Sequence, residues 1–262
     1  MKIVRFELDG QVRHGVMDGD RVYGLHGELF DAFEVVKNEC HPLESVCLLA
    51  PVAPSKVVAV GLNYRDHAEE VGKDIPAEPM LFIKPSTAII GPGEPIRLLP
   101  EGERVDYEAE LAAVVGRRAY RVPEERVAEH LLGFTCLNDV TARDMQRRDG
   151  QWTRAKSFDT FCPLGPCIET ELNPDGVEVR ARVNGETRQA SNTRNFIFPL
   201  ARLVSFISRV MTLLPGDVVS TGTPSGIGPL RVGDVVEVEV EGIGVLRNPV
   251  RGYEHRREET EA

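Results

Sequence analysis

The chain lacks the features that mark several large classes of protein. Its 262 residues contain no apolar run close to the ~18 residues that a membrane-spanning helix needs, and its start, MKIVRF, does not read as a signal peptide. The five cysteines are odd in number and include no C-x2-C pair, so neither a disulfide framework nor a zinc knuckle is indicated. We therefore expect a cytoplasmic protein that has no membrane partner.

Signatures of nucleotide and nucleic-acid binding are missing as well. No G-x-G-x-x-G follows an expected strand, and no Walker motif is present. The 220–228 loop spaces its glycines like a phosphate cradle, but it has neither the required lysine nor a helix behind it. The formal net charge of −10 would repel a polyanion at long range, so we expect no nucleic-acid partner.

Lysine is scarce, with 6 Lys against 25 Arg. Lys84 and Lys156 are therefore positions at which a compact ammonium charge could be specifically required, because arginine cannot replace it there. Chance would also leave some lysines scattered along the chain. A lysine that snorkels at the surface is the alternative for Lys156.

The pattern of strands and turns predicts an α+β protein dominated by strands. Asp-Gly turns at 9–10 and 18–19 separate short apolar runs, which predicts a small β-rich N-terminal domain over residues 1–50. A Pro-rich linker then leads into a main domain over 51–252, and a charged tail follows over 253–262. The regular strand-helix alternation of a doubly wound sheet is absent from this pattern.

Within the main domain we expect Asn63 to cap a helix over 64–72. A second helix is expected over 123–132, and the clearest amphipathic helix spans 199–213. Strands are expected over 80–84, 108–115 and 133–137, and Asn184-Gly185 predicts a hairpin after the strand over 177–183.

The most informative string is Asp106-Tyr107-Glu108-Ala109-Glu110, which runs directly into an apolar segment. Side chains two apart on a strand project from the same face, so Glu108 and Glu110 should lie side by side. Two neighbouring carboxylates repel unless a cation lies between them, and oxygen ligands favour Mg²⁺, Mn²⁺ or Ca²⁺. A solvated strand face with two ordinary acids is the alternative, and this pair alone does not decide between them.

Two further clusters of polar residues follow apolar runs, where binding loops are expected. His67 and Glu70 are i, i+3 neighbours on a helix face and could form an acid-base dyad, although the spacing alone favours an ordinary surface pair. Asp139 ends a strand and could add a third carboxylate to the acidic pair, or it could cap the helix that follows. Arg143 and Gln146 share a face of that helix.

The chain resembles the fumarylacetoacetate hydrolase family over roughly residues 56–250. The strings that carry the resemblance stand in the family's order: GLNYRDHAEE at 61–70, FIKPS at 82–86, YEAE at 107–110, NDVTARDMQ at 138–146, AKSFD at 155–159 and TGTP at 221–224. The resemblance implies a mixed β-roll, assembled as a homodimer, as the catalytic domain. Its length and short N-terminal part resemble those of bacterial members that act on 2-hydroxyhepta-2,4-diene-1,7-dioate.

The resemblance also implies roles for individual residues. Glu108, Glu110 and Asp139 would bind Mg²⁺, or Mn²⁺ or Ca²⁺ in its place. His67, Glu70 and Lys156 would be catalytic. Arg143, Gln146 and Thr223 would bind the substrate. The larger fumarylacetoacetases have an aspartate ligand where this chain has Asn63, which argues against the fumarylacetoacetase substrate itself.

The expected function is that of an enzyme that acts on 2-oxo or 2-hydroxydienoic acids through a metal-stabilised enolate. Isomerisation of 2-hydroxyhepta-2,4-diene-1,7-dioate in aromatic catabolism is the first choice. The alternatives are C–C bond hydrolysis of the acylpyruvate or fumarylacetoacetate type, oxaloacetate decarboxylation or tautomerisation, and a noncatalytic metal-dependent binding protein. The partner is expected to be a small 2-oxo acid whose remote carboxylate would need a cation, for which the candidates are Arg65, Lys84 and Arg194.

Overall fold

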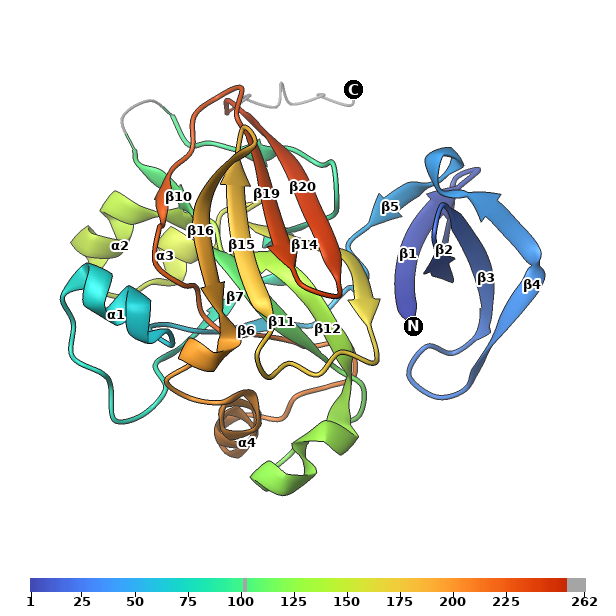
Figure 1. Ribbon diagram of the computed structural model, residues 1–262, viewed down its shortest axis with the longest axis horizontal. Helices are drawn as coiled ribbons and strands as arrows, with labels where there is room; N and C mark the ends of the chain where they lie inside the picture. Colours follow the sequence, from blue (N-terminus) through green and yellow to red (C-terminus); the bar gives the residue numbers. More distant parts are fainter. Residues whose placement is uncertain (101–102, 254–262) are drawn as a thin grey trace, which may run out of the picture.

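The computed structural model describes residues 1–100 and 103–253, so most of the expected charged tail lies outside the described residues. Strands account for 44% and helices for 18% of the described residues, which confirms the expected strand-dominated α+β class (Figure 1). No helix within the described ranges is long and apolar enough to cross a membrane.

The largest sheet has twelve strands. In spatial order, ten of them are β4 (Phe33–Pro42), β3 (Arg21–Gly27), β2 (Gln11–Asp18), β1 (Lys2–Leu8), β14 (Cys162–Glu169), β12 (Leu131–Asn138), β11 (Ala109–Val115), β17 (Val218–Ser220), β6 (Val57–Val60) and β7 (Leu81–Lys84). The other two are β5 (Cys47–Leu49), which pairs with β1, and β8 (Ile89–Ile90), which pairs with β14.

The first fifty residues form the hairpins that the Asp-Gly turns predict. Asp9 and Gly10 both have positive φ, at 51° and 73°, as the tight turn between β1 and β2 requires. The meander continues directly into the main sheet, because Lys2 pairs with Glu169 and Ile3 with Ile168 of β14. The N-terminal strands therefore extend the sheet of the catalytic region.

A second sheet of five strands covers β11 and β12. Its order is β16 (Glu186–Asn192), β15 (Glu178–Val183), β19 (Val235–Val240), β20 (Gly244–Arg251) and β9 (Ile96–Arg97). Strands β15 and β19 alternate buried with more exposed residues, so their apolar side chains pack inward. Every residue of β11 is buried, because this strand is covered on both faces.

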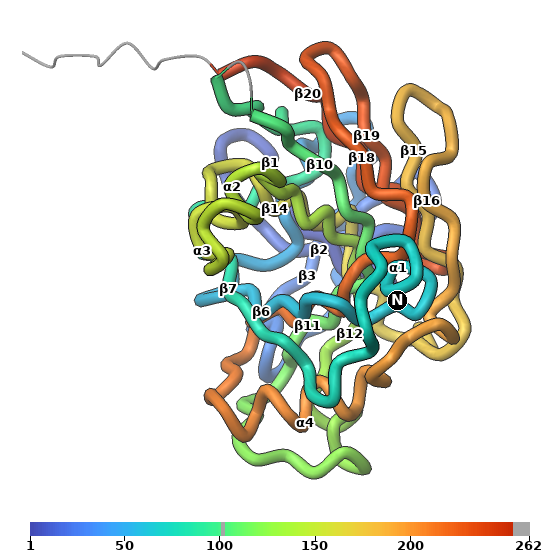
Figure 2. Tube along the Cα trace, turned by 90° about the vertical axis from the view of Figure 1, so that its left-hand side faces the viewer, coloured from blue at the N-terminus to red at the C-terminus, as the bar shows by residue number. Residues whose placement is uncertain are grey.

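Three short strands make a small third sheet, and the helices lie outside the sheets. The strands are β13 (Thr141–Ala142), β10 (Val105–Tyr107) and β18 (Gly228–Pro229). The α-helices are α1 (Arg65–Val71), α2 (Arg143–Asp149), α3 (Thr153–Lys156) and α4 (Leu200–Val210). Figure 2, turned by 90°, shows α4 at the lower end of the molecule, apart from α2 and α3.

The remaining helices are single turns or short 3₁₀ segments. They are η1 (Leu43–Ser45), η2 (Ser86–Ala88), η3 (Glu124–His130) and η4 (Thr193–Asn195). The helix expected over 123–132 is thus a 3₁₀ helix that ends where β12 begins. The hairpin at Asn184-Gly185 is confirmed, since Val183 pairs with Glu186.

The expected cap at Asn63 is wrong. The residue before α1 is Tyr64, whose side chain makes no capping hydrogen bond. The buried Asn63 amide instead donates to the Thr221 carbonyl at 2.7 Å, and its oxygen accepts from the Phe198 amide at 2.8 Å. A buried asparagine that satisfies backbone groups of two other segments is not available to cap a helix.

Candidate metal and catalytic site

The three predicted metal ligands come together where β10, β11 and β12 meet. Glu108 lies in the break between β10 and β11, and Asp139 follows the last residue of β12. The Asp139 amide donates to the Glu108 carbonyl at 2.9 Å, which ties the two strand ends together. One ligand oxygen each from Glu108, Glu110 and Asp139 lies within 4.8 Å of the others, and all three residues are buried. This buried acidic triad could bind a divalent metal.

Two buried lysines hold Asp139. The Lys84 ammonium donates to Asp139 Oδ1 at 2.6 Å, and the Lys156 ammonium donates to Oδ2 at 2.5 Å. Lys156 also donates to Glu108 Oε2 at 2.9 Å. Burial alone would lower the pKa of Lys156, but Asp139 and Glu108 outweigh it and raise that pKa. The two scarce lysines therefore serve as charged partners of the triad.

An arginine network orders the other side of Glu108. The Arg143 guanidinium donates to Glu108 Oε1 and, at 2.8 Å, to Asp106 Oδ2. Arg104 also reaches Asp106, with its Nε 2.7 Å from Oδ1. Burial alone would raise the pKa of Glu108, but the charges of Lys156 and Arg143 hold it well below its usual range. These contacts therefore favour the ionised form of Glu108.

Glu110 has no cationic side chain of its own among residues 1–100 and 103–253. Its Oε2 accepts from the Ser220 hydroxyl and, at 2.9 Å, from the Gly222 amide. Burial, followed by the charges of Asp139 and Glu108, raises the pKa of Glu110 well above its usual value. A buried carboxylate beside two others is the environment that a cation stabilises, and an all-oxygen donor set fits a hard divalent ion.

His67 and Glu70 form the predicted pair, one turn apart in α1. His67 Nδ1 lies 2.8 Å from Glu70 Oε2, and the Gly226 amide donates to Glu70 Oε1 at 2.9 Å. Because a carboxylate only accepts, Nδ1 carries the proton and Nε2 of a neutral imidazole remains free to take one. Gly226 has a φ of +96°, and a Cβ there would lie 2.1 Å from the Arg188 carbonyl, so only glycine fits.

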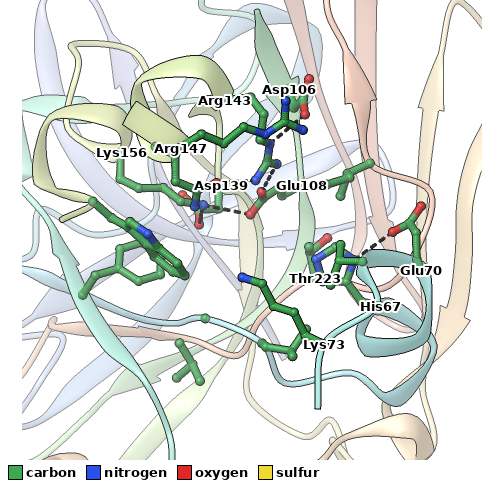
Figure 3. Close-up of a pocket in the computed structure, with 18 of the residues that line it drawn as sticks. His67, Glu70, Lys73, Asp106, Glu108, Asp139, Arg143, Arg147, Lys156 and Thr223 are labelled. Carbon is green, nitrogen blue, oxygen red and sulfur yellow. Dashed lines mark hydrogen bonds and ion pairs between the residues drawn. The ribbon is translucent and has the colours of Figure 1, made fainter. Parts of the chain in front are cut away.

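One cavity of about 450 Å³ joins these groups. His67, Glu70, Glu108, Asp139 and Lys156 all line it, with the dyad across the open space from the carboxylates (Figure 3). The Lys156 ammonium lies 4.9 Å from the centre of the Phe82 ring, and Phe82 packs edge-on against Trp152 at 5.4 Å. The cavity therefore has a charged inner end and an aromatic wall.

The three predicted substrate contacts also line this cavity, but their polar groups have protein partners. Arg143 Nη1 donates to Gln146 Oε1 at 2.6 Å. The Thr223 hydroxyl donates to the Ala109 carbonyl and accepts from Gln189 Nε2, both at 2.9 Å. The structure thus brings these residues to the site and holds their orientation.

None of the three candidates for a remote carboxylate lines the cavity. Lys84 is fully buried against Asp139 and the Val140 carbonyl. Arg65 and Arg194 are exposed and are not among the residues that line the cavity. The cations that the sequence reasoning missed are Lys73, Arg104 and Arg147, all of which line it. Asp106 was also missed, although it lies two residues before Glu108, a spacing that places two side chains on the same face of a strand.

Comparison with known proteins identifies the family. Residues 56–251 match the fumarylacetoacetate (FAA) hydrolase C-terminal family. The chain belongs to this family. Residues 1–51 match a second family, described as Rv2993c-like, N-terminal. The resemblance predicted from six separate strings is therefore confirmed.

The relatives of this chain in the FAA hydrolase family are named for different activities. A 2-hydroxyhepta-2,4-diene-1,7-dioate isomerase from Mycobacterium marinum is 42% identical with a TM-score of 0.90, covering 97% of this chain and 100% of that one. Oxaloacetate tautomerase fahd2 of Xenopus laevis is 42% identical over 219 residues, which span 79% of this chain and 69% of the relative.

A third relative was crystallised with a metal. The maleylpyruvate hydrolase from Sphingobium sp. SYK-6, in complex with manganese(II) and pyruvate, is 28% identical with a TM-score of 0.82, covering 97% of this chain and 100% of that one. The family thus includes isomerase, tautomerase and hydrolase relatives of this chain.

Proposed function

We propose that the protein is a divalent-metal-dependent enzyme that acts on 2-oxo or 2-hydroxydienoic acids, with 2-hydroxyhepta-2,4-diene-1,7-dioate isomerisation as the first choice. The proposal rests on one observation: Glu108 and Asp139 of the buried acidic triad line the same cavity as the oriented His67–Glu70 pair. Such a site can stabilise negative charge and move a proton in the same reaction. The similarity to the Mycobacterium marinum isomerase supports this choice.

Each residue of the site has a part in this chemistry. A divalent cation held by Glu108, Glu110 and Asp139 would stabilise the negative charge that develops on the substrate's 2-oxygen. Lys156 keeps two of these carboxylates in place and adds a positive charge beside them. His67 Nε2 accepts the proton that leaves the 2-hydroxyl group and returns it to a carbon of the conjugated chain. Glu70 holds the imidazole and stabilises its protonated form.

Two other reactions are second candidates because named relatives support them. The maleylpyruvate hydrolase supports C–C bond hydrolysis, in which His67 would activate water. The Xenopus laevis relative supports oxaloacetate tautomerisation, in which His67 would move a proton between carbon and oxygen. A panel of 2-oxo and 2-hydroxydienoic acids, assayed by loss of enol absorbance and by product identification, separates the three reactions.

The same panel tests the metal. Turnover is expected with Mg²⁺ or Mn²⁺ and should be lost in EDTA, because the cation supplies the main stabilisation of charge. Calorimetric titration with Mg²⁺ and oxalate, a mimic of the enolate, measures the preformed site directly. Equal turnover with EDTA and with metal would overturn the proposed mechanism.

Replacing His67 tests catalysis against a noncatalytic metal-binding role. His67→Ala should lower kcat by roughly 10²–10⁴-fold, the usual contribution of a general acid-base group. The affinity for Mg²⁺, measured by calorimetry, should stay unchanged because His67 contacts none of the triad's carboxylates in the described structure. His26→Ala is a matched control, since His26 also lies 2.9 Å from a glutamate, Glu39, but in the N-terminal strands. Full activity in His67→Ala would contradict the assignment.

A further inference from the structure

Lys73 and Arg147 differ from the other charged residues of the cavity. Both line it, yet among residues 1–100 and 103–253 neither side chain has a hydrogen bond or an ion pair. Every other charged side chain that lines the cavity is paired. Those residues are His67, Glu70, Arg104, Asp106, Glu108, Asp139, Arg143 and Lys156.

The two cations reach the cavity from two separate elements. Lys73 follows Gly72, whose left-handed φ of 63° ends helix α1 and turns the chain. Arg147 lies one helical turn beyond Arg143 in α2, so both arginines share a face of that helix. In Figure 3 the Lys73 ammonium points into the open space toward the carboxylates. Lys73 and Arg147 therefore flank the outer part of the cavity.

The inner cations are already paired without these two residues. Lys84, Arg104, Arg143 and Lys156 all donate to Asp106, Glu108 or Asp139. Lys73 and Arg147 therefore add positive charge that the inner network does not neutralise. Unpaired cations in a concave site attract an anionic group of the ligand.

The wall between the charged inner end and the outer cations is apolar. It is formed by Leu62 and Val71 together with Phe82 and Trp152, whose rings pack edge-on. A hydrocarbon segment can lie on such a wall without leaving a polar group unsatisfied. The cavity thus offers a charged inner end, an apolar wall and two outer cations. A ligand with a charged group at each end and an apolar middle would match this arrangement.

We propose that Lys73 and Arg147 bind the remote carboxylate of the substrate, so that this enzyme is specific for dicarboxylates of the 2-oxo acid class. The inference rests on the proposed function, which places the 2-oxo acid end of the substrate at the acidic triad. Lys73 and Arg147 are substrate-contacting residues that determine specificity, and they take no part in proton transfer. Arg147 contributes a planar fork that suits a carboxylate, and Lys73 contributes a point charge.

A matched pair of unreactive ligands tests this inference. The ligands are 2-oxoheptanedioate and 2-oxoheptanoate, which have the same chain length and differ only in the second carboxylate. Binding to the full chain with saturating Mg²⁺ is measured by calorimetry and by the fluorescence of Trp152, the only tryptophan of the chain, which lines the cavity. The variants are Lys73→Gln, Arg147→Gln and the double variant.

The wild type should bind the diacid at least roughly tenfold more tightly than the monoacid, as expected for a charge-assisted hydrogen bond. Each single variant should reduce that preference, and the double variant should abolish it without weakening the monoacid. The control Arg148→Gln removes the neighbouring arginine of α2, whose partners are Glu103 and Asp149, and should leave the preference intact.

The possible results separate this inference from the proposed function. Equal binding of diacid and monoacid by the wild type overturns the inference, and so does a double variant that keeps the wild-type preference. Loss of the preference in the double variant supports the inference even if no dienoic acid is turned over, a result that would count against the proposed reaction alone. Turnover measurements with the isomerase substrate should then show a raised KM with little change in kcat.

Discussion

Asp139 is the carboxylate that both buried lysines of the site contact. Both of its oxygens accept hydrogen bonds from lysine ammonium groups, and all three side chains are almost completely buried. Breaking a buried ion pair by removing one partner is strongly destabilising, because the remaining charge is left without compensation. The lysines therefore stabilise the folded chain even when no metal or substrate is bound.

Lys84→Met tests this role. In EDTA the substitution should lower the free energy of unfolding by about 3–5 kcal/mol, because Asp139 Oδ1 loses its ammonium partner. The deficit should shrink with Mg²⁺, since a more negative triad gains more from a bound cation. Urea unfolding in both conditions measures the difference.

The control for Lys84→Met is Lys37→Met, at an exposed position of β4. Surface substitutions of this kind usually change stability by about 0.5 kcal/mol or less. A loss below about 1 kcal/mol in Lys84→Met would show that the buried pair contributes little, as some buried pairs do.

At the residue scale the sequence indicated several of the side chains that gather at the site. The acidic string around Glu108 and the scarcity of lysine drew attention to Glu108, Glu110 and Lys156, and the family resemblance then gave these residues their roles. Lys73 and Arg147 lie outside the strings that carry the resemblance, and each is one cation in an exposed turn or helix. Their position at the cavity depends on how α1 and α2 pack.

At the scale of elements, Asp217 joins two neighbouring strands at their starting ends. It precedes β17, and its Oδ1 accepts from the Ser55 hydroxyl at 2.6 Å while its Oδ2 accepts from the Lys56 ammonium at 2.5 Å, just before β6. Burial would raise the pKa of Asp217, but the hydrogen bonds from the Leu214 amide, Lys56 and Ser55 together hold it below its ordinary value of 3.8.

The stability that this carboxylate contributes should depend on pH. Because its pKa is lower in the folded protein than in the unfolded chain, its contribution is fully present above pH 3.8 and is lost as the pH falls through the folded value. Asp217→Asn should lower stability by about 1–3 kcal/mol at neutral pH. The variant should also show a weaker loss of stability in acid, measured by urea unfolding from about pH 7 to about pH 3. An unchanged acid profile would contradict the assignment.

Elements with a strong local pattern were predicted well. The hairpin at Asn184-Gly185 and the amphipathic segment found as α4 were both anticipated, because turn chemistry and helical periodicity are local properties. The segment found as η3 was predicted as a helix of unspecified type, since periodicity does not distinguish a short 3₁₀ helix from an α-helix. The role of Asn63 was missed because its partners lie 135 and 158 residues away in the sequence.

At the scale of the whole molecule, the N-terminal strands are continuous with the main sheet. Ile3 is fully buried in one apolar cluster with residues of β11, β14 and β17, including Val114, Ile168 and Val218. The sequence suggested a separate small domain, since composition and turns do not show which strand the first one pairs with. We infer that residues 1–50 and the catalytic region unfold together.

Ile3→Ala tests that inference. The substitution should lower the free energy of unfolding by about 2–5 kcal/mol, as for other large-to-small changes in a core, and should shift one single cooperative transition. Val12→Ala is the control, since Val12 is 50% exposed on β2. Thermal unfolding followed by circular dichroism and by Trp152 fluorescence should give coincident curves. Two separate transitions would show that the N-terminal strands unfold independently.

The loop between β17 and β18 touches both halves of the site. Its Gly222 amide donates to Glu110 of the acidic triad, and its Gly226 amide donates to Glu70 of the dyad. Any displacement of this short backbone segment would disturb the cation ligands and the proton-transferring pair at once. Substitutions that shift this loop should consequently weaken cation affinity and proton transfer together, where a change confined to either group alone would affect only one of them.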